Sequence, residues 1–287
     1  LLLSDLPGVK VKATLLPGTV AGTSDLLVDL TPGQRFSGSV DADNAGNRYT
    51  GEYRVGATLN FNEPLGLGDV ASLRLLTSGD GLNYARASYQ LQFGKATLGV
   101  AYSALAYELG EEFASLQATG TVRTTSLYGS YPLVRTRNNN LTAGLLLDDK
   151  VFEDKIGSPA SVSDKKIQVL TASVRGDSRD FLGGGGLNSF ALAASAGNVD
   201  LQTPTVLAID AATAHSNGHF NKLTWSVSRV QWLGEQVSLF AAANGQFASS
   251  NLDVSEKMEL GGMYGVRAYP EGEAYADQGY VASLEAR

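Results

Sequence analysis

The chain has 287 residues, 43% of them hydrophobic and 18% charged, a balance that excludes wholesale disorder. Its net charge of −7, without a visible cluster of Lys and Arg, argues against a nucleic-acid partner, and the absence of cysteine leaves neither a disulfide framework nor a thiolate metal site. The 33 glycines, together with Tyr, Thr, Ser and Val, favour many strands joined by turns, so we expect an all-β fold.

Residues 1–34 differ in character from the rest of the chain. An apolar helix end precedes the turn Leu6-Pro7-Gly8, and two short strands follow at 9–16 and 25–30. This pattern predicts the tail of a small α/β module. Because the sequence opens in mid-element without a Met or a signal peptide, we expect more chain upstream.

From about residue 35 onward, hydrophobic and polar residues alternate in stretches of roughly ten. Between Tyr53 and Phe61, every second residue from Tyr53 is apolar, and the residues between them include Arg54 and Asn60. Each such strand therefore has one apolar and one polar face. The same alternation occurs at 71–75, 82–93, 141–148, 222–227 and 237–244.

Two architectures explain such strands: a soluble sandwich or lipocalin-like barrel with its apolar face inward, and a membrane barrel with its apolar face toward lipid. The segments run to about nine to twelve residues, the length that a tilted strand needs to cross a bilayer. Polar residues recur on one face, as a water-filled interior requires, so we predict a transmembrane antiparallel β-barrel. Aromatic residues near predicted strand ends fit its interfacial girdles: Tyr102, Tyr107, Tyr131, Phe190 and Trp232.

About eleven complete strands precede a long segment at about 250–279, and a further strand begins at Tyr280. An open barrel edge in lipid would leave backbone groups without hydrogen-bond partners, at a cost of several kcal/mol each. We therefore expect the native barrel to continue beyond Arg287, and we interpret the sequence as a fragment of a longer chain.

The segment 252–273, followed by Asp277-Gln278-Gly279-Tyr280, is the most distinctive part of the sequence. It resembles the sixth extracellular loop of two-partner secretion transporters, the TpsB-type ShlB/FhaC/HecB hemolysin secretion/activation family. Shorter matches at 3–9, 22–26, 64–69 and 131–135 extend the resemblance over essentially the whole chain. The resemblance implies a bacterial outer-membrane barrel of about sixteen strands, incomplete here at 35–287, preceded at 1–34 by the C-terminal part of a periplasmic POTRA domain.

The resemblance also implies a function, the passage of an unfolded partner exoprotein of hemolysin or adhesin type to the cell surface. The POTRA region would recognise the exoprotein by strand addition to a sheet edge, and passage through a polar lumen would need no nucleotide hydrolysis. The partners are then the exoprotein and the outer-membrane lipid bilayer, and no catalytic residue or cofactor is expected. The alternatives are a barrel-assembly insertase of the same superfamily, a diffusion porin and, more distantly, an outer-membrane enzyme.

The resemblance implies a role for Arg267 as well. In the family, the arginine of a Val-Arg-Gly-Tyr type motif anchors the loop inside the lumen on an acidic residue of a later strand, and a guanidinium suits such a bidentate contact. Here that acidic residue is expected beyond Arg287; the alternative is a solvated surface arginine. The expected anchor motif is Val266, Arg267, Ala268 and Tyr269, where Ala replaces Gly and needs a negative φ, with Gly261, Gly262 and Pro270 in support.

Three other constellations have simpler explanations than chemistry. His215 and His219 are four residues apart, but the Asn-Gly between them is a turn signal, so they would not share a helix face and no metal site is expected. The glycines at 183–186 lack the Lys-Ser or Lys-Thr of a phosphate loop and predict a hairpin turn. The acids at 148–149 and 177–180 are interpreted as strand-end residues at a barrel rim rather than catalytic or calcium-binding groups.

Overall fold

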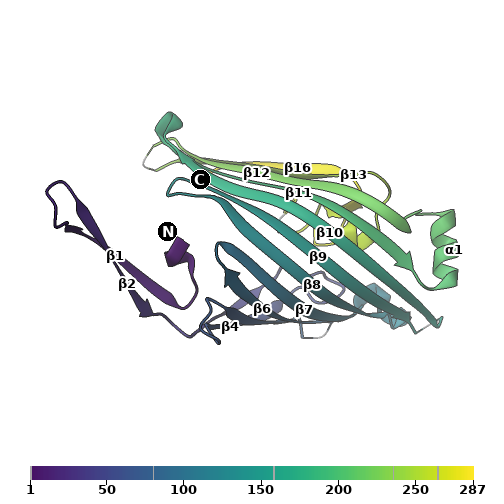
Figure 1. Cartoon of the computed structure of the whole chain (residues 1–287). Coiled ribbons are helices and arrows are strands. Elements are labelled where there is room, and N and C mark those ends of the chain that lie inside the picture. The colour runs from purple at the N-terminus through teal and green to yellow at the C-terminus, as the bar shows by residue number, and fades with distance from the viewer. Residues whose placement is uncertain (1, 80, 158, 235, 264) are drawn as a thin grey trace.

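The computed structural model describes residues 2–79, 81–157, 159–234, 236–263 and 265–287. Its main body is one antiparallel sheet of 12 strands that curves around a concave face (Figure 1). Eleven of these strands precede the long segment, as predicted, and the twelfth follows it and pairs with the eleventh. In sheet order, the strands are β3 (Phe36–Asp43), β4 (Arg54–Asn62), β5 (Val70–Thr77), β6 (Leu82–Phe93), β7 (Ala96–Glu108), β8 (Thr119–Arg135), β9 (Asn139–Ile156), β10 (Ser161–Asp180), β11 (Gly186–Leu201), β12 (Gly218–Trp232), β13 (Ser238–Ala248) and β16 (Gly279–Ala286).

The two faces of the sheet differ in polarity, which confirms the alternation seen in the sequence. Leu127, Leu147 and Leu170 lie opposite one another on β8, β9 and β10, and all three side chains are exposed on the convex face. One residue along each strand, the row on the concave face holds Ser126 and Asp148, and the Ser126 hydroxyl donates to the Asp148 carboxylate over 2.6 Å. An exposed apolar convex face and a polar concave face are the pattern of a membrane barrel.

Strands β8 to β12 are longer than the nine to twelve residues predicted, reaching 20 residues in β10. Beyond Leu147 and Leu170 their convex face becomes polar: Gln168 donates to Asp149 over 2.8 Å, and Lys166 pairs with the same carboxylate at 3.1 Å. The wall therefore continues past the apolar belt, where the convex face is polar and the apolar alternation of that face stops. Asp148 and Asp149 consequently lie inside β9, and their assignment to a strand end was wrong.

The two ends of the barrel wall carry different connections. At the near end, beside the N-terminal hairpin, consecutive strands are joined by short turns; the far end carries longer loops and helix α1 (Pro204–Ala212) (Figure 1). The sequence analysis missed α1, although Pro204 near its N-terminus is a helix-start signal. Over the residues that the structure describes, no helix is both long and apolar enough to cross a membrane.

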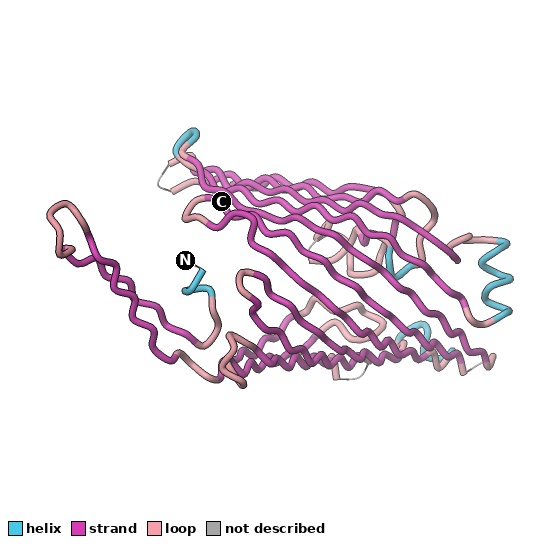
Figure 2. Tube along the Cα trace, viewed as in Figure 1, coloured by secondary structure: helices cyan, strands magenta, loops and turns pink. Residues whose placement is uncertain are grey.

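Residues 2–34 form a separate segment, whose twisted two-stranded ribbon projects from the near end (Figure 2). The predicted strands are confirmed as β1 (Val9–Pro17) and β2 (Ser24–Pro32), an antiparallel pair preceded by the short 3-10 helix η1 (Leu2–Asp5). The ribbon contacts the wall through Asp5, whose two carboxylate oxygens each accept a hydrogen bond of 2.7 Å from Arg135. The pKa of Asp5 is lowered, chiefly by this hydrogen bonding.

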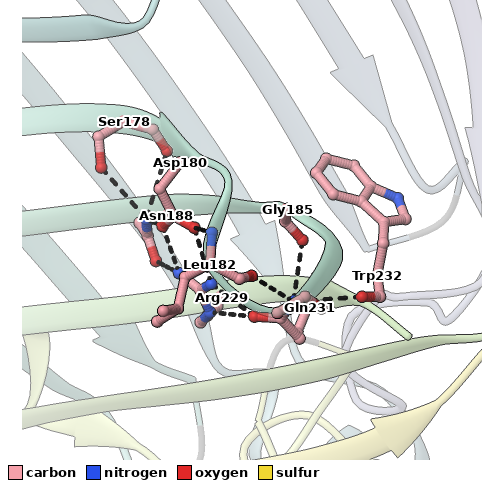
Figure 3. Close-up of polar contacts among 9 residues, drawn as sticks. Ser178, Asp180, Leu182, Gly185, Asn188, Arg229, Gln231 and Trp232 are labelled. Atoms are coloured by element: carbon pink, nitrogen blue, oxygen red, sulfur yellow. Dashed lines mark hydrogen bonds and ion pairs between the residues drawn. The ribbon is translucent and has the colours of Figure 1, made fainter. Parts of the chain in front are cut away.

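The predicted hairpin turn at 183–186 is confirmed at the near end between β10 and β11, where Gly184 has a φ of 98° that favours glycine. A polar network on the convex face holds this turn (Figure 3). Arg229 donates to both oxygens of Asp180, at 2.7 and 3.0 Å, and the amide of Gln231 donates to the carbonyls of Leu182 and Gly185. The network lies on the same face as the exposed Phe190 of β11.

One residue assigned to the aromatic girdle lies elsewhere. Tyr107 pairs with Leu82 and Gly120 in a row on the concave face, where its hydroxyl donates to Asp154 over 2.8 Å. Its assignment to the lipid-facing girdle was wrong because Tyr107 lies five residues after Tyr102 in β7, so the two side chains point to opposite faces. Tyr102, Tyr131 and Phe190 are exposed on the convex face as expected.

Candidate functional site

The long segment between β13 and β16 is the structural feature that distinguishes the concave face. We call residues 249–278 the lumen loop; it folds back within the curve of the sheet instead of extending away from it (Figure 1). Its first part, residues 250–257, is the root. A ribbon of β14 (Met258–Glu259) and β15 (Tyr275–Ala276) follows, and residues 260–274 between these strands are the tip.

The root rests on an apolar patch of the concave wall. Leu252, almost fully buried, packs in a cluster to which β9, β10, β11 and β12 all contribute. An apolar patch on the polar face of a membrane barrel would be costly in contact with water, and the root covers it. The wall residues of the cluster are Phe152, Ile167, Val169, Val199, Leu201 and Phe220.

Two carboxylates of the root are bound by lysines from three wall strands. Lys165 of β10 lies 2.9 Å from both oxygens of Asp253. Glu256 is paired with Lys150 of β9 at 2.6 Å and with Lys222 of β12 at 2.8 Å. The side chains of Asp253 and Glu256 are only 9% and 3% exposed, so these charges depend on their protein partners rather than on water.

The pKa of Asp253 lies below its ordinary value. Burial alone would raise this pKa, but the positive charge of Lys165 and hydrogen bonds from Ser255 and Lys165 outweigh burial. Asp253 is therefore held as a carboxylate, and its charge is available to the ion pair with Lys165.

Asp277 ties the outgoing and returning limbs of the loop together at the root. Its carboxylate accepts from the backbone N–H of Leu252 over 2.9 Å and pairs with Lys257 at 3.3 Å. The amide of Gln246, on the inner face of β13, donates to the carbonyls of Glu256 and Asp277 at 3.2 and 3.1 Å. The start of the lumen loop, its end at Asp277 and the wall strand β13 are thus joined by one network of polar contacts.

The tip reaches across to the other side of the sheet. The amide of Asn47, in the loop between β3 and β4, donates to the carbonyl of Glu271 over 3.0 Å. The pKa of Glu271 is raised, first by burial and then by the negative charge of Glu259. Because β3 and β4 are the first strands of the sheet and the root lies on β9 to β12, the lumen loop crosses the space inside the wall.

The predicted anchor, Arg267, lies in the tip and forms an ion pair with Glu285 of β16. The expectation of an acidic partner on a strand beyond Arg287 stays a prediction; within this chain, Arg267 reaches Glu285 because the tip folds back as far as the end of β16. Glu285 also accepts from Arg287 at 2.9 Å. The Arg267 side chain is 64% exposed and that of Glu285 25%, so this contact is far more accessible than the root.

The residues expected to support Arg267 lie close together in the tip. The backbone N–H of Gly262 donates to the carbonyl of Tyr269 over 3.0 Å, and that of Tyr269 to the carbonyl of Val266 over 2.9 Å. A Cβ on Gly261 would meet the carbonyl oxygen of Pro270 at 2.1 Å, so this close approach requires glycine. Ala268 keeps a negative φ, the condition under which it can replace the glycine of the family motif: positive φ among described non-glycine residues occurs at Glu63, Glu111, Gln117 and His215.

The sequence analysis did not identify the residues that hold the root. The available signal was a lysine next to alternating apolar residues on the face that is otherwise polar, as in Lys165, Ile167 and Val169. This signal is weak because the partners, Asp253 and Glu256, are separated from their lysines by 88 and 106 residues.

The two histidines do not form a site of their own. His215 lies in the loop after α1 and His219 in β12, so the two do not share a helix face, as predicted. In the part of the chain that the structure describes, no three His, Cys, Asp or Glu residues group in a way that would hold a metal ion.

Comparison with known proteins gives concordant results. Residues 22–285 match the family model described as haemolysin secretion/activation protein ShlB/FhaC/HecB. The chain is 33% identical over 288 residues to the heme/hemopexin transporter protein HuxB of Haemophilus influenzae, covering 99% of this chain and 51% of HuxB. The chain thus spans about half the length of this curated relative.

Two solved structures show the same fold. CdiB from Escherichia coli superposes with a TM-score of 0.81 at 20% identity, covering 99% of this chain and 54% of CdiB. BamA from Haemophilus ducreyi, lacking POTRA domains 1–3, gives a TM-score of 0.59 at 13% identity, with 99% and 58% covered. Both are similar to this chain over its length, and CdiB agrees with it more closely.

Proposed function

Because the chain belongs to the haemolysin secretion/activation protein family (ShlB/FhaC/HecB), we propose that it forms the larger part of a pore through which an unfolded partner exoprotein crosses to the cell surface. The fold is that of an outer-membrane β-barrel, and the outer membrane is its location. On this proposal the near end of the wall faces the periplasm and the far end the outside.

The observation that carries the proposal is the lumen loop. A channel for a long chain must be wide, and a wide channel must be obstructed when idle. The root of the loop is attached to strands β9, β10 and β12, and its tip reaches Asn47 in the loop between β3 and β4. The lumen loop therefore crosses the concave space, which supports a role as that obstruction. Arg267 and Glu285 would then set the resting position of its tip.

Residues 1–34 would be the C-terminal part of a periplasmic POTRA domain, and residues 35–287 the transmembrane barrel. The exposed ribbon of β1 and β2 supports recognition by strand addition, in which backbone hydrogen bonds give affinity without demanding one exoprotein sequence. The exoprotein and the lipid bilayer would be the partners, with no role for nucleic acid. Family members are transporters, and this one would likewise move its cargo without catalysis or nucleotide hydrolysis.

A barrel-assembly insertase is the second candidate, since this chain shares its fold with BamA. The family match favours the transporter. An insertase would act on many barrels, whereas a transporter of this family serves a partner exoprotein. Removing an insertase would therefore lower the amounts of other barrels, and removing a transporter would stop secretion of the exoprotein.

The test compares secretion by wild type, Arg267→Ala and the control Arg137→Ala, each produced from the complete gene beside the gene for its exoprotein. Amounts of heat-modifiable barrel in the outer membrane are matched. We expect Arg267→Ala to lose most secretion and Arg137→Ala, in an exposed near-end turn, to keep it. If wild type secretes nothing and its depletion lowers other barrels, the protein is an insertase.

A further inference from the structure

The lumen loop is attached to the wall in two places that differ in kind. At the root, two buried carboxylates meet three lysines and Leu252 fills an apolar patch. At the tip, the attachments made by its described residues are the solvent-accessible pair of Arg267 with Glu285 and an amide-to-carbonyl hydrogen bond from Asn47. The difference bears on which part of the loop can leave the pore.

Separating a buried ion pair leaves charges without partners in a region that water does not reach, which is strongly unfavourable. Separating an exposed pair returns both groups to water at little cost. Lifting the root would in addition expose Leu252 and the wall residues beneath it. The tip therefore leaves its resting contacts far more readily than the root does.

We propose that Asp253 and Glu256 are positioning residues that keep the root fixed to the wall throughout transport, and that the tip alone moves aside for the exoprotein. The ribbon of β14 and β15 is the junction, since it is the last paired segment before the tip and is only two residues long on each side. This inference rests on the proposed function. It differs from a mechanism in which the whole loop leaves the lumen.

The chain offers two matched contacts for testing this. Asn47 donates to the carbonyl of Glu271 at the tip, and Asn251 donates to the carbonyl of Ala214 at the root, over 2.6 Å. Because the chain has no cysteine, each contact can be replaced by a pair of cysteines and closed with the same short, reducible thiol-specific linker. The tip tether is Asn47→Cys with Glu271→Cys; the root tether is Asn251→Cys with Ala214→Cys.

Secretion and single-channel conductance in planar bilayers are measured for each pair before linking, after linking and after reduction. We expect the linked root tether to match its unlinked form in both measurements. The linked tip tether should lose secretion and channel opening, and reduction should restore both. The proposal is overturned if the root tether blocks as strongly as the tip tether, or if the tip tether has no effect. Should wild type secrete nothing, the proposed function fails, while the conductance comparison still decides the inference.

The positioning role of Glu256 has its own readout. Val199, on the wall beneath the root, is 1% exposed, so Val199→Cys reports whether the root covers it. We expect Glu256→Gln to raise the rate at which this thiol reacts by more than an order of magnitude, because Lys150 and Lys222 lose their shared counter-charge. Val254→Cys, exposed in the root, should react at the same rate with or without Glu256→Gln. Unchanged protection of Val199→Cys would remove Glu256 from the role.

Discussion

The ammonium of Lys165 lies 2.9 Å from each carboxylate oxygen of Asp253, although the two residues are 88 positions apart in the chain. The pair joins a wall strand to the root of the lumen loop and is nearly inaccessible to water, with side chains 10% and 9% exposed. Lys165 also lies 4.5 Å from the centre of the Phe152 ring, which adds a second favourable contact for its charge.

Replacing Lys165 should therefore destabilise the barrel more than replacing its neighbour. We expect Lys165→Met to lower the free energy of unfolding by about 3–5 kcal/mol, because Asp253 remains buried without a counter-charge. Lys166→Met is the control: Lys166 pairs with Asp149 on the polar convex face, with both side chains 38% exposed, and its loss should cost about 0–1 kcal/mol. The free energy of unfolding of both variants is measured in urea, with the loss of heat-modifiable mobility as the signal for unfolding. Equal losses for the two variants would contradict the assignment.

The lowered pKa of Asp253 predicts loosening of the root in acid. Since folding depresses this pKa, its contribution is complete above the unfolded value of about 3.9 and is lost as the pH falls through the folded pKa. Asp253→Asn should make the stability profile flatter below about pH 4. The midpoint of heat modification is measured from neutral pH downward, and Glu273→Gln, an exposed tip residue, should leave the slope unchanged. A steep acid transition that survives in Asp253→Asn would assign it to other carboxylates.

Glu285 should matter for function more than for stability. It binds Arg267 of the tip and Arg287, which follows the end of β16, and both arginine side chains are more than half exposed. We expect Glu285→Gln to change the free energy of unfolding by less than about 1 kcal/mol, while channel openings become more frequent because the tip loses its partner. Arg287→Gln, which leaves Arg267 paired, should not increase openings. Openings that rise equally in both variants would show that the strand end, rather than the tip, is responsible.

The near-end turn should depend on Arg229. Its guanidinium contacts both oxygens of Asp180 and also the Asn188 side chain (Figure 3). We expect Arg229→Gln to lower the free energy of unfolding by about 1–2 kcal/mol. This loss is larger than that of an ordinary surface ion pair because the contact is bidentate and part of a network. Thermal unfolding of the purified barrel measures this cost. Arg137→Gln, in another near-end turn, should have no comparable effect, and a similar loss there would argue against a special role for the network.

Local patterns were sufficient to predict the strands but not their full length. The bounds of β6 coincide with the predicted segment 82–93, because alternation runs through the whole strand. Strand β9 was predicted only as far as Asp148, yet it continues to Ile156, since the convex face turns polar at Asp149 and its apolar alternation stops there. Helix α1 was missed because it is short and lies in a loop of mixed composition.

The candidate site was predicted in part for a similar reason. The tip was identified because Gly261, Gly262 and the residues around Arg267 are contiguous in sequence and resemble a family motif. The root was missed because its ion pairs join Lys150, Lys165 and Lys222 to residues far along the chain, and no local pattern encodes which strands become neighbours. Glu285 was overlooked because its significance depends on how far the tip folds back.

The extension of β8 to β12 past the apolar belt separates the attachment of the lumen loop from the lipid-facing surface. Each lysine that holds the root has a polar neighbour on the convex face: Asp149 beside Lys150, Lys166 beside Lys165, and Asn221 beside Lys222. The concave side of the wall there is covered by the root, and the convex side is polar and lies outside the apolar belt. The attachment of the lumen loop therefore does not depend on contact between this part of the wall and lipid.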